Sequence, residues 1–66
     1  MFKSIRAKKI DSEIEKIKSQ LFDVDSDIKM AEVCGNTELA TILYETRVIL
    51  IETLQLKYER KFYVMN

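Results

Sequence analysis

Three aspartates at alternate positions are the residues of this chain that most resemble a metal site. Asp23, Asp25 and Asp27 occupy the spacing of the first three ligands in a calcium-binding loop. Such a loop also needs glycine at its sixth position and a bidentate glutamate at its twelfth. This chain has Ile28 and Cys34 there. We therefore interpret the aspartates as a solvated acidic face, and we expect neither a metal ion nor another cofactor.

The other reactive side chains offer no familiar catalytic pair. The chain has no histidine and a single cysteine, Cys34, which falls where a helix is expected to end. The negative end of a helix dipole disfavours a thiolate there. Glu45, Glu52 and Glu59 recur every seven residues, so they form one polar ridge and lie too far apart to act together. We expect a protein that is not an enzyme.

Basic residues gather near the two chain ends. They are Lys3, Arg6, Lys8, Lys9, Lys57, Arg60 and Lys61. Eleven basic and eleven acidic residues give zero net charge, which argues against a uniformly basic nucleic-acid binder. A local basic end still suits contact with a phosphate backbone or an acidic protein surface. The alternative is that these residues solvate the ends and complement a helix dipole.

Two helices separated by one turn would position these residues. The only glycine, Gly35, lies near the midpoint, and the chain has no proline. Glycine suits the left-handed position after a helix, and Asn36 or Thr37 suits the N-cap of the next one. The predicted parts of a single domain, residues 1–66, are a helix over about 4–34, a turn over 34–37 and a helix over about 37–64. The first helix has two candidate N-caps, Ser4 and Ser12, so its start stays open.

Apolar residues of the first helix form one narrow stripe. They alternate steps of three and four: Ala7, Ile10, Ile14, Ile17, Leu21, Val24, Ile28 and Ala31. This spacing is typical of a coiled-coil seam. Because a short turn makes neighbouring helices antiparallel, we predict an all-α, antiparallel two-helix hairpin.

The second helix has two apolar rows on different faces. The aromatic row is Tyr44, Val48, Ile51, Gln55, Tyr58 and Phe62. A leucine-rich row is Leu39, Ile42, Leu43, Ile49, Leu50, Leu54 and Leu56. One partner helix cannot bury both rows, so we expect the first helix to cover the leucine-rich row and another chain to cover the aromatic row. The alternative is that the aromatic side chains wrap around the edge of their own hairpin.

Association is also expected from chain length. A chain of 66 residues buries only about 60% of its unfolded surface, and one cysteine cannot form an internal disulfide. Oligomerisation is the remaining source of stability. We expect a homodimer in which two hairpins form a four-helix bundle, although a heterocomplex fits the same pattern.

The expected function is that of a small protein-protein interaction module, acting as a regulator, adaptor or inhibitor. The aromatic row is its predicted oligomer or partner interface. The alternative is a nucleic-acid-binding regulator that uses the basic end. The chain has neither an apolar run of signal-peptide length near its start nor a membrane-spanning run, so we expect a cytoplasmic protein without membrane contact.

Overall fold

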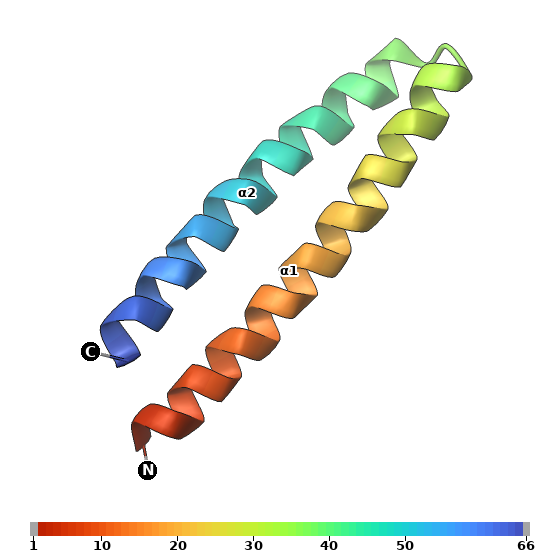
Figure 1. Ribbon diagram of the computed structural model, residues 1–66. Coiled ribbons are helices and arrows are strands. Elements are labelled where there is room, and N and C mark those ends of the chain that lie inside the picture. The colour runs from red at the N-terminus through yellow and green to blue at the C-terminus, as the bar shows by residue number, and fades with distance from the viewer. Residues whose placement is uncertain (1, 66) are drawn as a thin grey trace.

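The computed structural model describes the backbone of residues 2–65 and the side chains of residues 8–63. It contains two long helices, α1 (Phe2–Val33) and α2 (Thr37–Met65), joined by a short turn (Figure 1). The helices run antiparallel and side by side, in a rod with Cα extents of 51 × 15 × 10 Å. The predicted hairpin of two packed helices is therefore confirmed, and the described backbone contains no strand.

The turn has the capping geometry that its sequence predicts. Gly35 has φ of 73°, in the left-handed region that glycine adopts without steric cost. The amides of Gly35 and Asn36 donate to the carbonyls of Glu32 (3.1 Å) and Ala31 (2.9 Å), which is the Schellman pattern. Asn36 Oδ1 then accepts from the amide of Leu39 at 3.1 Å, so Asn36 is the N-cap of α2. These bonds end one helix and begin the next within three residues.

The start of α1, left open by the sequence, is at Phe2. Residues 4–11 are therefore helical. The side chains of Lys3, Arg6 and Ala7 lie outside the described side chains.

The core between the helices is thin. The apolar stripe of α1 faces α2, with Ile14, Ile17, Ile28 and Ala31 buried, and α2 adds the small side chain of Ala40. The rest of the stripe within the described side chains is half-buried: Ile10, Leu21 and Val24. No side chain of residues 8–63 is completely shielded from solvent. The hairpin alone therefore obtains limited hydrophobic stabilisation.

The expectation that α1 covers the whole leucine-rich row is wrong. The residues of α2 that face α1 form a central row with heptad spacing: Ala40, Leu43, Arg47, Leu50, Leu54, Lys57 and Lys61. Four members of the leucine-rich row lie outside it and are exposed: Leu39, Ile42, Ile49 and Leu56. Each of the four lies one residue from a central-row position, which turns its side chain about 100° around the helix.

Candidate interaction surface

The aromatic row lies along one flank of the central row. Tyr44, Val48, Tyr58 and Phe62 are exposed large side chains. Gln55 is also exposed, whereas Ile51 is half-buried. The six predicted interface residues therefore lie along one side of α2, at positions another molecule can reach.

Two tyrosines of this row also contact side chains of α1. The Tyr44 hydroxyl donates a hydrogen bond of 3.2 Å to Glu32 Oε1. Acceptance by this carboxylate raises the pKa of the Tyr44 phenol above its ordinary value of 10.0. Lys18 Nζ lies 5.9 Å from the centroid of the Tyr58 ring, within the range of a cation–π contact. The structure thus agrees in part with the alternative that the aromatic side chains follow the edge of their own hairpin.

Phe62 continues this row toward the open end of the hairpin. Its ring meets that of Tyr63 edge-on, with centroids 6.0 Å apart and an interplanar angle of 77°. Such T-shaped pairs are favoured by the aromatic quadrupole. Both rings remain largely exposed, so aromatic surface is present near the open end of the hairpin.

A second apolar row lies on the opposite flank of α2. We define this aliphatic row as Leu39, Ile42, Thr46, Ile49, Thr53 and Leu56. Thr46 Oγ1 donates to the Ile42 carbonyl at 3.0 Å, and Thr53 Oγ1 donates to the Ile49 carbonyl at 2.8 Å. Both hydroxyls are therefore satisfied by the helix itself and do not require water. Sequence analysis did not separate this row, because it placed Leu39, Ile42, Ile49 and Leu56 in the leucine-rich row that α1 was expected to cover.

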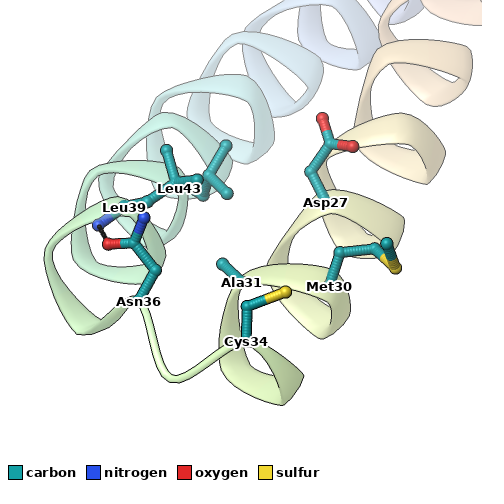
Figure 2. A pocket seen from close by; sticks show the side chains of 7 residues that line it. All are labelled: Asp27, Met30, Ala31, Cys34, Asn36, Leu39 and Leu43. Atoms are coloured by element: carbon teal, nitrogen blue, oxygen red, sulfur yellow. Dashed lines mark hydrogen bonds between the residues drawn. The ribbon is translucent and has the colours of Figure 1, made fainter.

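A groove continues the aliphatic row at the turn (Figure 2). Met30 and Cys34 border it from the end of α1, and Leu39 and Leu43 border it from α2. Its volume is about 280 Å³, and its remaining lining residues are Asp27, Ala31 and Asn36. The lining is mainly apolar, so the groove extends the apolar surface of α2 onto α1.

Ion pairs hold the helices together near the open end. Lys57 pairs with Glu13, and Lys61 Nζ lies 2.7 Å from Asp11 Oδ1. The hydrogen bond from Lys57 holds the pKa of Glu13 below its ordinary value of 4.5, with further attraction from nearby cations. Two of the seven basic residues expected at this end therefore act within the hairpin.

Of the other basic residues near this end, the structure describes the side chains of some but not of others. Lys8, Lys9 and Arg60 are exposed. Lys3 and Arg6 belong to α1 by their backbone, but their side chains are not among those described. The described side chains of this cluster thus present three exposed cations besides the two in ion pairs.

The residues first considered for chemistry do not assemble into a reactive centre. Asp25 Oδ1 accepts from Arg47 Nε at 2.8 Å across the helices, so this carboxylate has a structural partner. Within the described residues, no three side chains of the metal-binding types lie close enough together to hold a metal ion. Cys34 is an exposed free thiol.

Comparison with known proteins assigns no family to this chain. No family model matches it, and no curated protein or solved structure matches it significantly. Neither described helix is long and apolar enough to cross a membrane.

Proposed function

We propose that this protein is a small, non-enzymatic protein-protein interaction module with α2 as its binding element. It self-associates through α2, as a homodimer that forms a four-helix bundle, and it acts as a regulator, adaptor or inhibitor. The observation that carries the proposal is the pair of exposed apolar rows on opposite flanks of one helix. Contiguous apolar surface of this extent is typical of interaction sites.

The composition of the central row supports association. Arg47, Lys57 and Lys61 occupy positions that leucine or isoleucine fills in a stable coiled coil. The ion pairs of Arg47 and Lys61 with α1 are partly exposed, and such pairs typically contribute only about 0.2–1 kcal/mol each. A hairpin with few buried residues and a charged interior row gains stability when further apolar surface is covered.

The aromatic row supports recognition of a protein. Tyrosine and phenylalanine are enriched at the centres of protein interfaces, where they bury large areas at low conformational cost. Tyr44 and Tyr58 are already oriented by Glu32 and Lys18, so less freedom remains to be lost on binding. The row therefore presents preformed anchors to a partner.

The test compares partner capture by the wild-type chain and by Tyr58→Glu, with Phe22→Glu as the control. Phe22 is an exposed aromatic residue of α1, and so it lies outside the aromatic, central and aliphatic rows of α2. We expect a specific protein of the native host to be retained by wild type and Phe22→Glu and lost from Tyr58→Glu. The same set of proteins bound by all three chains would contradict the proposal for the aromatic row.

The alternative, a nucleic-acid-binding regulator, has less support. Lys57 and Lys61 have carboxylate partners in α1, so fewer cations are available to phosphates than the sequence suggests. This alternative requires binding to RNA or DNA that weakens steeply with salt and with neutralisation of Lys8 and Lys9. Fluorescence anisotropy with labelled oligonucleotides at low ionic strength measures this binding, and its absence would exclude the alternative.

A further inference from the structure

The two exposed rows of α2 differ in their chemistry. The aromatic row carries polar tips, namely the hydroxyls of Tyr44 and Tyr58 and the amide of Gln55. The aliphatic row has no polar group without an internal partner, because Thr46 and Thr53 bond to their own helix. Permanent homodimer interfaces are more apolar than those that exchange partners. The rows therefore suit two different occupants.

We propose that the aliphatic row binds a second copy of this chain, with the two α2 helices antiparallel, while the aromatic row stays available to a partner protein. This inference rests on the proposed self-association and assigns it to one face. Both rows are rotated about 100° from the central row, close to the angle between neighbours in a four-helix bundle. The geometry therefore allows either row to form the dimer interface, and the chemistry of the side chains decides which row does.

Antiparallel pairing about the middle of the aliphatic row is sterically self-complementary. It places Leu39 opposite Leu56, Ile42 opposite Thr53 and Thr46 opposite Ile49 of the second copy. In the middle of the contact a small side chain thus faces a large one, which favours close packing. The four central residues are β-branched, so they have little rotamer freedom to lose. Equivalent pairing of the aromatic row would place the amide of Gln55 against Ile51.

The charge distribution favours the same orientation. Residues 22–50, which include the turn, contain six acidic and two basic residues, whereas the rest of the chain contains nine basic and five acidic residues. Antiparallel pairing brings the acidic half of one copy toward the basic end of the other. Parallel pairing would place like charges together. In this register Glu45 of one copy lies near Glu52 of the other, but both border the row at its exposed rim, where salt screens their repulsion.

The groove at the turn completes the proposed interface. Leu39 borders this groove and would lie opposite Leu56 of the second copy. Met30 and Cys34 line the other side, and the volume of about 280 Å³ has room for a leucine side chain. The two-fold axis provides this contact twice, once at each end of the row.

The first test uses adjacent residues on opposite flanks. Val48 is 52% exposed in the aromatic row, and Ile49 is 62% exposed in the aliphatic row. Multi-angle light scattering should give a dimer for wild type and Val48→Glu, and the 7.8 kDa monomer mass for Ile49→Glu. A dimeric Ile49→Glu, or a monomeric Val48→Glu, overturns the assignment. A wild type that is monomeric and helical would instead contradict the proposed function itself.

A cross-linking test covers the case in which Ile49→Glu fails to fold. In a Cys34→Ser background, chains with Thr46→Cys and chains with Ile49→Cys are oxidised separately and as a mixture. The antiparallel register predicts that the mixture gives at least a several-fold higher yield of disulfide-linked dimer than either chain alone. Equal or higher yields from the separate chains would overturn it, since parallel helices pair identical positions.

Discussion

The hydroxyl of Tyr44 donates a hydrogen bond of 3.2 Å to Glu32 Oε1. This bond links the aromatic row of α2 to a glutamate near the end of α1. The two residues come from opposite sides of the turn, so this bond depends on the antiparallel packing of the hairpin. It holds the Tyr44 ring in a defined place, although Tyr44 is 48% exposed. This bond supports the proposed role of the aromatic row as a binding surface, because it fixes Tyr44 before a partner arrives.

Replacing Glu32 with glutamine should lower the pKa of Tyr44 toward 10.0, because the phenol then loses its charged acceptor. Since the pKa is raised in the folded state, this bond contributes stability below pH 10.0 that is lost as pH rises through the folded value. Ultraviolet titration of the tyrosines measures the shift, and Tyr44→Phe identifies the transition. Unchanged titration in Glu32→Gln would exclude the bond in solution.

Acid should weaken the open end of the hairpin. The pKa of Glu13 is lowered by its hydrogen bond from Lys57, so its stabilising contribution is present above pH 4.5 and lost as pH falls through the folded value. Glu13→Gln should flatten this part of the curve of melting temperature against pH. Glu15→Gln provides the control, because Glu15 bonds only within α1, to Lys18. Identical acid dependence in wild type and Glu13→Gln would contradict the ion pair.

Truncation of the core should be costly despite its small size. Ile28 is 4% exposed between the helices, so Ile28→Ala should destabilise the fold by about 2–4 kcal/mol. Phe22 is 76% exposed, and Phe22→Ala should change stability by no more than about 0.5 kcal/mol. Urea unfolding at one fixed protein concentration measures both, since association couples stability to concentration. Similar losses in the two variants would contradict the packing between α1 and α2.

The turn depends on the conformation of Gly35. A Cβ atom at this position would meet no other atom within 4 Å, so the cost of Gly35→Ala comes from its positive φ alone and should be about 1–2 kcal/mol. Gly35→Asn should cost less, because asparagine tolerates this conformation better. Thermal unfolding monitored by circular dichroism compares the two variants. A larger loss for asparagine than for alanine would argue against the left-handed cap.

The hairpin could be predicted from the sequence because its signals are local. The stripe of α1 has one period and one face, and Gly35 with Asn36 specifies how the chain reverses. These features depend on a few neighbouring residues, so no knowledge of the packing is needed to read them.

The candidate surface could be predicted only in part. Central and flanking rows of α2 are one residue apart, so the spacing alone did not show which leucines face α1. The structure decides this by placing Leu43 and Leu50 inward and Ile42 and Ile49 outward. Pairs across the helices, such as Lys57 with Glu13, depend on the exact register and are not visible in the periodicity.

The proposed function depends on self-association of the chain, which is measured by the molar mass of the wild-type protein in solution. Sedimentation equilibrium over a wide concentration range, with helix content followed by circular dichroism, should give twice the chain mass of 7.8 kDa for the helical protein. Dilution should lower the mass and the helix content together, because the hairpin has little core of its own. A fully helical species of 7.8 kDa at every concentration would contradict self-association.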